Sequence, residues 1–361
     1  MRLFQNSGIG GTYVHRLNRL AAGAATFRQR LDVFLDDRFG ASHFLEPVLN
    51  RDASAFFTNA DDWRLQQMWA VQAGMPAGSS PEQILLAQIE QHRTEVFYNL
   101  DPMRFQSDFV RQLPRCVRRT VAWRAAPSPG ADFGAYDLVV CNFPGILAGY
   151  AKNGWHAKYF SPAHDPMLDE YAGNQERPVD VLFVGGFSRH HQRRAKLLEA
   201  VAACADKLNV VMHLDQSRLA RFAASPLGRL LPLAQQRVPA AVRRVSRPSV
   251  YGRDMYAALS RAKIVLNAAI DMAGQDRGNM RCFESLGAAC MLLTDDGRYP
   301  SGMVDGETLV IFKSQDEVIG KLLDLVADGT LRQRIGTAGN RMIRASYSKP
   351  QQFLSFTGLL G

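Results

Sequence analysis

Glycine and positive charge stand side by side in the segment 179–194. An apolar run at 179–184 is followed by Gly185 and Gly186, and then by a helix-like stretch that begins near His191. Glycine lets a backbone approach a ligand closely, and a helix N-terminus offers unpaired N–H groups and positive partial charge to an anion. Arginines in such a place can make bidentate bonds to a diphosphate. The segment therefore predicts a phosphate-binding loop, and the simpler alternative is a tight turn. The predicted contacts are Gly185, Gly186, Arg189, Arg193 and Arg194.

A second candidate is the carboxylate of Glu284, which follows the glycine-containing segment 276–279. It lies on a predicted helix at 280–289 whose other face carries Met280, Phe283 and Leu286. A carboxylate beside a loop rich in backbone N–H groups could accept bonds from both hydroxyls of a ribose. The alternative is an acidic side chain in the first helical turn that stabilises the helix dipole.

Other nucleotide and metal signatures do not occur in the sequence. The chain contains neither the Gly-x-Gly-x-x-Gly fingerprint nor a Walker lysine pattern, so a dehydrogenase is a distant alternative. It has no Asp-x-Asp pair of the kind that holds a divalent metal on a diphosphate. Its five cysteines are scattered and form no Cys-x-x-Cys pair, which argues against a disulfide framework and a zinc site. We therefore expect no metal and no cofactor.

Charge and composition restrict the partners. The 361 residues are 47% hydrophobic and 21% charged, with a net charge of +9, as in a globular protein of two domains. Basic residues cluster at 111–119, 189–196 and 243–253, and would suit phosphorylated small molecules or an anionic membrane surface. Aromatic residues do not alternate with them, so no nucleic acid is expected. No apolar run approaches the roughly 20 residues of a membrane span, and no secretory signal pattern is present. These features predict a cytoplasmic protein that could contact the inner face of a membrane peripherally.

The elements that must position these residues alternate between strands and helices. Strand-like runs occur at 96–98, 117–123, 138–143 and 155–160, and again at 179–184, 209–214, 264–268, 291–294 and 309–312. Ser80, Pro81 and Gln83 have the sequence of a capping box with proline in the first turn. The pattern predicts two α/β domains of Rossmann-like type that face each other across a cleft. The order of elements within 11–79 and 222–248 stays open.

The predicted boundaries follow from composition. Residues 1–165 form the N-terminal Rossmann-like domain, and the segment 166–178, rich in proline, acid and glycine, is the linker. Residues 179–348 form the second Rossmann-like domain. Residues 349–361 form a C-terminal helix that could pack back on the N-terminal domain.

The sequence from Arg281 through Phe283 and Glu284 to Asp295 resembles a conserved region of group 1 (GT4-like) glycosyltransferases. In that superfamily an arginine–phenylalanine–glutamate helix is followed by a strand. Asp276 and Glu284 stand at the spacing of the superfamily's glutamate-x7-glutamate element, with aspartate in the first place. The likeness covers 179–348 well and is looser over 1–178, where residues 7–11 resemble the glycine-rich loop on the acceptor side. It implies the GT-B fold, with the nucleotide-sugar in the C-terminal domain and the acceptor in the N-terminal one.

The resemblance also assigns roles to individual residues. It implies that Glu284 binds the ribose, that Arg189 with Arg193 or Arg194 neutralises the departing diphosphate, and that Tyr251 and Gly252 lie near the base. Asp276, Gly278 and Asn279 would face the donor sugar. The predicted donor site also includes Asn267, Arg281 and Ser285. The acceptor side would include Gly10, Gly11 and His15.

Histidine is a candidate for acid–base work at the predicted hinge. His164 lies in the sequence Ser-Pro-Ala-His-Asp-Pro, where it could bond a sugar hydroxyl or move a proton. The alternative is an exposed histidine beside an Asp-Pro turn. The predicted catalytic residues are therefore His164, Asp276 and Arg189.

The sequence thus predicts a glycosyltransferase that uses a UDP- or GDP-linked sugar. The acceptor, a glycan, lipid-linked molecule or protein of surface polysaccharide or glycoconjugate assembly, is not identified. The reaction is expected to be metal-independent and retaining. The alternatives are a nucleotide-sugar epimerase on the same fold and a non-catalytic basic protein that binds nucleotides or anionic polymers.

Overall fold

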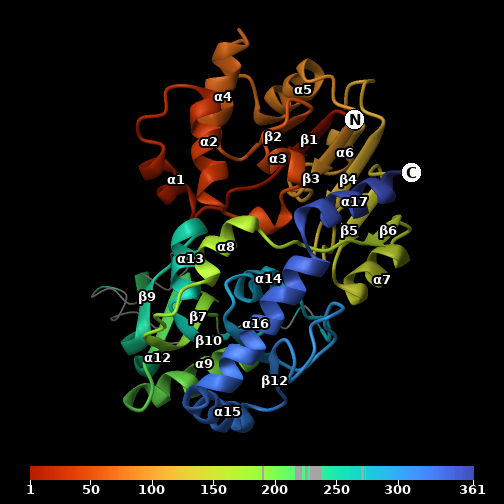
Figure 1. The fold of residues 1–361 in the computed structure, drawn as a ribbon. Coiled ribbons are helices and arrows are strands. Elements are labelled where there is room, and N and C mark those ends of the chain that lie inside the picture. Colours follow the sequence, from red (N-terminus) through yellow and green to blue (C-terminus); the bar gives the residue numbers. More distant parts are fainter. Residues whose placement is uncertain (189–190, 216–221, 224–226, 228–236, 270–271, 273) are drawn as a thin grey trace. The chain divides into compact units, whose positions relative to one another are not determined.

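The chain divides into two compact units, each built on one parallel sheet (Figure 1). The computed structural model describes residues 1–188, 191–215, 222–223, 227, 237–269, 272 and 274–361. The first unit comprises Met1–Pro162 with Lys349–Gly361, and the second comprises Ala163–Ser348. The predicted α/β class with parallel sheets is confirmed.

The sheet of the first unit has the strand order β2-β1-β3-β4-β5-β6. Its strands are β1 (Leu3–Asn6), β2 (Ala55–Thr58), β3 (Val96–Asn99), β4 (Arg119–Trp123), β5 (Leu138–Cys141) and β6 (Ala157–Tyr159). Leu3 pairs with Ala55 on one side and with Val96 on the other. The chain therefore reverses its winding direction at β1 and β3, and the carboxyl ends of these two strands form the switch point of this sheet.

Several helices of the first unit begin at side-chain caps. The helices of this unit are α1 (Val14–Leu20), α2 (Phe27–Asp37), α3 (Glu46–Leu49), α4 (Trp63–Gln72), α5 (Pro81–Gln91), α6 (Ser107–Val110) and α7 (Pro144–Lys152), with the 3-10 turn η1 (Ala41–His43). The capping box predicted for α5 is present, because Ser80 and Gln83 bond each other's backbone N–H groups. A second capping box, between Thr26 and Gln29, starts α2.

The last helix, α17 (Lys349–Leu360), belongs to the first unit. Lys349 is 2% exposed, and its Nζ donates to the carbonyl oxygens of Ala41, Ser42 and Phe44 at 2.7, 3.2 and 2.7 Å. Phe356 is fully buried, and its ring centroid lies 4.9 Å from that of Tyr98. A buried cation and aromatic contacts thus help to attach the C-terminal helix to this unit.

The sheet of the second unit has the order β12-β11-β10-β7-β8-β9. Its strands are β7 (Val179–Gly186), β8 (Val210–Asp215), β9 (Ser246–Pro248), β10 (Ala262–Leu266), β11 (Met291–Asp295) and β12 (Val310–Phe312). From β7 the chain winds outward through β8 to β9 and then returns to β10 on the other side of β7. The switch point of this sheet therefore lies between the carboxyl ends of β7 and β10, where ligands bind in doubly wound sheets.

Helices cover both faces of this sheet. They are α8 (Asp169–Ala172), α9 (Gln192–Ala203), α12 (Ala240–Val245), α13 (Gly252–Ser260), α14 (Met280–Gly287), α15 (Gln315–Ala327) and α16 (Gly329–Ser346), with the 3-10 turns η2 (Pro166–Leu168) and η3 (Cys204–Asp206). Val181 and Phe183 pack in one core with Leu198 of α9 and Leu322 of α15. Leu182 packs in a second core with α13 and α14. This alternation along β7 is the period of two that a strand requires.

Two segments differ from what the sequence predicted. Residues 166–178, predicted as a linker, fall within the second unit and contain η2 and α8. Gly185 and Gly186, predicted as a turn, continue β7 and pair with Leu214 and Asp215 of β8. A Cβ on Gly185 would lie 3.1 Å from the ring of Phe183, so glycine avoids a tight contact at this position of the strand.

Candidate functional site

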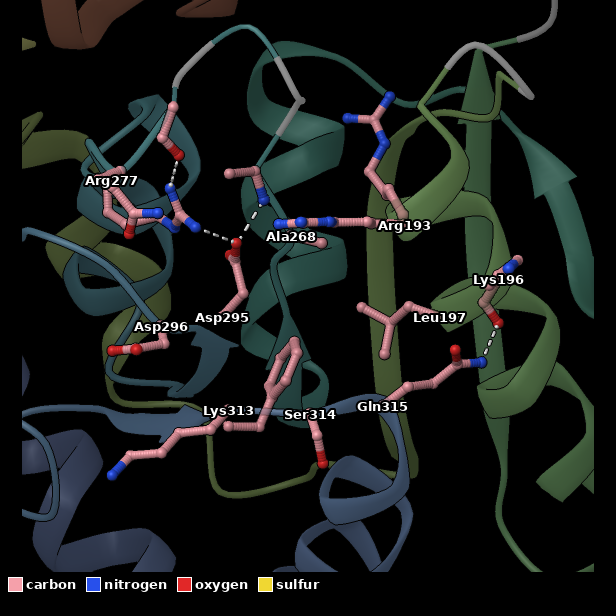
Figure 2. A pocket seen from close by; sticks show the side chains of 15 residues that line it. Arg193, Lys196, Leu197, Ala268, Arg277, Asp295, Asp296, Lys313, Ser314 and Gln315 are labelled. Carbon is pink, nitrogen blue, oxygen red and sulfur yellow. Dashed lines mark hydrogen bonds and ion pairs between the residues drawn. The ribbon is translucent and has the colours of Figure 1, made fainter. Parts of the chain in front are cut away.

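A pocket of about 670 Å³ opens at the carboxyl edge of the second sheet (Figure 2). Its wall comes from the start of α9, the ends of β10, β11 and β12, the segment before α14 and the start of α15. The lining residues are Arg193, Arg194, Lys196, Leu197, Ala268, Ala269, Gly274, Gln275, Arg277, Asp295, Asp296, Phe312, Lys313, Ser314 and Gln315. This is the edge at which the strand order places a ligand site.

The pocket carries an excess of positive charge. Five lining side chains are basic and two, Asp295 and Asp296, are acidic. Leu197, Ala268 and Phe312 add an apolar part to the wall. A concave site with this balance attracts an anion that also has a nonpolar portion.

The first turn of α9 carries two arginines. The side chain of its N-cap residue, His191, makes no capping hydrogen bond, and no acidic residue lies in the first turn, which instead contains Arg193 and Arg194. Arginines at this end of a helix add to the positive pole of the helix dipole, which is unfavourable unless an anion is present. By contrast, α15 begins with a Ser314 cap and has Asp316 and Glu317 in its first turn. The start of α9 therefore has the local structure of an anion-binding site.

Arg277 and Asp295 form an ion pair in the opposite wall, 2.8 Å from nitrogen to oxygen. Figure 2 shows the two side chains pointing toward each other. Asp295 also accepts a hydrogen bond from the backbone N–H of Ala269 at 3.0 Å. Burial raises the pKa of the Asp295 carboxyl, and the nearby Arg277 guanidinium opposes this shift.

Several residues predicted for the donor site line this pocket or adjoin it. Arg193 and Arg194 line it, and Asn267 immediately precedes the lining residue Ala268. The Asn267 side chain donates to Thr294 Oγ1 at 3.1 Å and accepts from Asn279 Nδ2 at 3.2 Å, so it joins β10, β11 and the start of α14. Arg189 lies outside the described residues.

Asp276, predicted to act in catalysis, is buried at 1% exposure. Its carboxylate forms an ion pair with Arg298 at 2.7 Å, and its neighbour Arg277 is the residue that lines the pocket. The backbone at Asp276 forms a parallel β-bridge with Arg298. In this bridge the N–H of Arg277 donates to the carbonyl oxygen of Arg298. The alternation of side chains along this extended segment separates Asp276 from Arg277.

Glu284, predicted to bind the ribose, lies in the interior of the second unit at 4% exposure. Arg281 Nη1 donates to its carboxylate at 2.7 Å. Burial raises the pKa of Glu284, while Arg281 lowers it. Ser285 is fully buried, and its hydroxyl has no partner among the described residues. These three residues do not line the pocket.

The remaining donor-site candidates flank helix starts. Tyr251 is the N-cap of α13, and Gly252 follows it at φ +56°. Gly278 has φ +97°, a backbone conformation that favours glycine, and Asn279 is the N-cap of α14. None of the four lines the pocket, although Gly278 directly follows Arg277.

His164 is buried, not exposed beside a turn. Its Nε2 lies 2.9 Å from Asp169, and its Nδ1 is buried without a partner among the described residues. A Cβ on Gly287 would lie 2.8 Å from this Nδ1, so the imidazole packs directly on α14. Burial lowers the pKa of His164, and Asp169 opposes the shift. These contacts describe a packing residue, and His164 does not line the pocket.

The residues predicted for the acceptor side lie in the first unit. Gly10 has φ +68°, and Gly10, Gly11 and His15 are exposed. Asp61 holds this loop by accepting a hydrogen bond from the N–H of Ile9 at 2.9 Å.

Sequence reasoning missed the opposite wall of the pocket. Arg277, Asp295, Asp296 and Lys313 were not assigned to the donor site, although the two aspartates come at the end of a predicted strand. That position was a usable signal, because ligands bind where parallel strands end. The described part of the chain contains no group of three or more metal-ligating side chains. Within the same residues, no helix has the length and apolar character of a membrane span.

Comparisons with known proteins agree with this architecture. Residues 193–353 match the family model described as "Glycosyl transferase-like". No curated protein sequence matches the chain. The structure of Anabaena Alr3699/HepE in complex with UDP and glucose aligns with a TM-score of 0.58 at 11% identity, over 100% of this chain and 99% of that chain. Sucrose-phosphate synthase from Thermosynechococcus elongatus aligns with a TM-score of 0.55 at 11% identity, over 99% and 98%.

A third similar structure is longer than this chain. An S. aureus TarM mutant in complex with UDP aligns with a TM-score of 0.54 at 10% identity, over 78% of this chain and 59% of TarM. This chain thus spans less than two thirds of TarM. At these identities the structures establish a shared fold, and the predicted likeness to group 1 glycosyltransferases is confirmed. The chain has the GT-B fold, and its residues 193–353 match the glycosyl transferase-like family model.

Proposed function

We propose that this chain transfers a sugar from a nucleoside diphosphate sugar, and that the donor's diphosphate binds at the start of α9. The observation that carries the proposal is the N-terminus of α9, which has no acidic residue in its first turn and presents Arg193 and Arg194 to a pocket at the carboxyl edge of the sheet. A diphosphate would supply the negative charge that this helix start lacks.

A uridine diphosphate sugar is the proposed donor. The structures of HepE and TarM contain UDP, and one HepE structure contains UDP-glucose. The pocket supplies basic side chains for a diphosphate and the apolar side chains Leu197 and Phe312 for a less polar part of the ligand.

The proposed chemistry is stabilisation of the leaving group. The bond between the anomeric carbon and the diphosphate oxygen breaks, a bond to an acceptor hydroxyl oxygen forms, and the hydroxyl proton is released. Arg193, Arg194 and the helix N-terminus would stabilise the charge that develops on the diphosphate. We propose that these cations take the place of a metal ion. Retention of anomeric configuration is proposed from the resemblance alone, and the acceptor is proposed to be a glycan or glycoconjugate.

The test is a turnover assay with UDP-glucose, other UDP-sugars and GDP-sugars, with and without glycan acceptors and with EDTA present. We expect release of UDP together with a new glycoside, whose anomeric configuration NMR would report. Conversion of the donor into an isomeric nucleotide sugar without acceptor would identify an epimerase instead. Donor binding without any turnover under all conditions would favour the non-catalytic alternative.

A further inference from the structure

We infer that Arg277 is a further anion-binding residue of the pocket, and that Asp295 is the residue that positions it. This inference rests on the proposed function, because it takes the ligand to be the diphosphate of the donor.

The guanidinium of Arg277 is fixed by three contacts. Its Nη1 donates to the carbonyl oxygens of Gly274 and Asp276 at 2.9 and 3.0 Å, and its Nη2 lies 2.8 Å from Asp295. The side chain is 10% exposed, whereas Arg193 and Lys196 across the pocket are exposed. A side chain already held in one place loses little conformational entropy when a ligand binds. Arg277 is therefore a preorganised cation of this pocket.

One donor of this guanidinium is unused. Arg277 Nε is buried and has no hydrogen-bond partner in the described part of the chain. A buried donor without a partner is unfavourable, and it marks a place where a ligand or water would supply the acceptor. In a pocket with an excess of basic side chains, that acceptor is an anion.

The backbone beside Arg277 is shaped to fit it. A Cβ on Gly297 would lie 2.7 Å from Arg277 Cγ and 2.9 Å from Arg277 Cζ. Only glycine allows the chain after β11 to pass this close to the guanidinium. Asp295, two residues earlier, is itself fixed by the N–H of Ala269, so it can hold the guanidinium in the wall.

Arg298, on the neighbouring segment after β11, provides a matched control. It forms an ion pair of similar length, 2.7 Å, with the buried Asp276, and a parallel bridge joins the two segments. Its side chain is 63% exposed and does not line the pocket. Replacing either arginine removes one positive charge and one arginine–aspartate ion pair. Only the replacement of Arg277 changes the pocket.

The experiment is calorimetric titration of UDP and of inorganic pyrophosphate into the full chain, for wild type and for the variants Arg277→Met, Arg277→Lys and Arg298→Met. Folding of each variant is checked by circular dichroism. We expect Arg277→Met to weaken binding of both ligands at least about tenfold, as for loss of a charge-assisted hydrogen bond. The affinity of Arg277→Lys should lie between those of wild type and Arg277→Met. The affinity of Arg298→Met should stay within about threefold of that of wild type. The dependence of affinity on salt should decrease in Arg277→Met alone.

Three results would overturn the inference. Equal weakening by Arg277→Met and Arg298→Met would show that Arg277 only maintains the loop. Unchanged affinity in folded Arg277→Met would show that Arg277 makes no ligand contact. If folded wild type binds neither ligand, the proposed function fails together with the inference. This outcome differs from the first two, in which wild type still binds.

Discussion

The Arg281 guanidinium lies 2.7 Å from the Glu284 carboxylate, three residues further along α14. Both side chains are largely buried, at 16% and 5% exposure. A buried ion pair is maintained only while both partners are present, since the loss of one leaves an uncompensated charge in the interior. The pair therefore makes Glu284 a stability residue in this structure.

Glu284→Ala is expected to lower the free energy of unfolding by roughly 3–5 kcal/mol, because it leaves Arg281 buried without its partner. The double variant Arg281→Met/Glu284→Leu should recover most of this loss. Urea denaturation of wild type, Glu284→Ala and the double variant measures these free energies of unfolding. A Glu284→Ala protein of wild-type stability that has lost UDP binding would instead support the ribose role implied by the family resemblance.

Asp276→Asn should leave UDP affinity within about threefold of wild type, because Asp276 faces Arg298 outside the pocket. The free energy of unfolding should fall by about 1–3 kcal/mol, as expected when a buried charged bond is weakened. Calorimetry and denaturation report the two quantities separately. Loss of turnover at unchanged stability would restore Asp276 as a catalytic residue.

His164 is expected to make stability depend on pH below neutrality. Burial lowers its pKa below the ordinary value of 6.5, so the unfolded chain takes up a proton at a higher pH than the folded protein does. The stability associated with the neutral imidazole is therefore present above pH 6.5 and is lost as the pH falls toward the folded-state pKa. The slope is at most about 1.4 kcal/mol per pH unit. Thermal unfolding of wild type and of His164→Asn, compared between about pH 5 and about pH 8, measures this pH dependence of stability. Parallel pH profiles would contradict the prediction.

Lys349→Met should destabilise the first unit by at least about 2 kcal/mol, because three buried carbonyl oxygens lose a charged donor. Lys152→Met is a suitable control, since Lys152 is exposed at the end of α7. Thermal unfolding that is equally affected by both substitutions would show that the α17 attachment contributes nothing specific.

Hydrophobic periodicity and caps predicted much of the fold. The apolar runs that became β3, β5, β10 and β11 are short, buried on both faces and bounded by polar residues, which is the pattern of a parallel sheet. The Ser80 capping box likewise predicted the start of α5. Gly185 and Gly186 were interpreted as a turn because glycine more often marks a turn than a strand. In this chain β7 continues through both.

The site was harder to predict, because it depends on side-chain direction. Sequence spacing brought Asp276 and Glu284 together as family positions, but in the structure both are paired with arginines inside the second unit. The residue that follows Asp276, Arg277, lines the pocket instead. Contact between Arg277 and Asp295 depends on the ends of two elements meeting at one edge of the sheet. No local pattern in the sequence specifies such a pairing.

The most direct test of the account is a calorimetric titration of UDP into wild type, into Arg193→Ala/Arg194→Ala and into Arg243→Ala/Arg244→Ala. Both double variants remove two positive charges from the second unit, but Arg243 and Arg244 are exposed on α12 and do not line the pocket. The account predicts that UDP binds wild type and the α12 variant with similar affinity, and binds the α9 variant at least about tenfold more weakly. Equal affinity for all three folded proteins, or no binding to wild type, would contradict it.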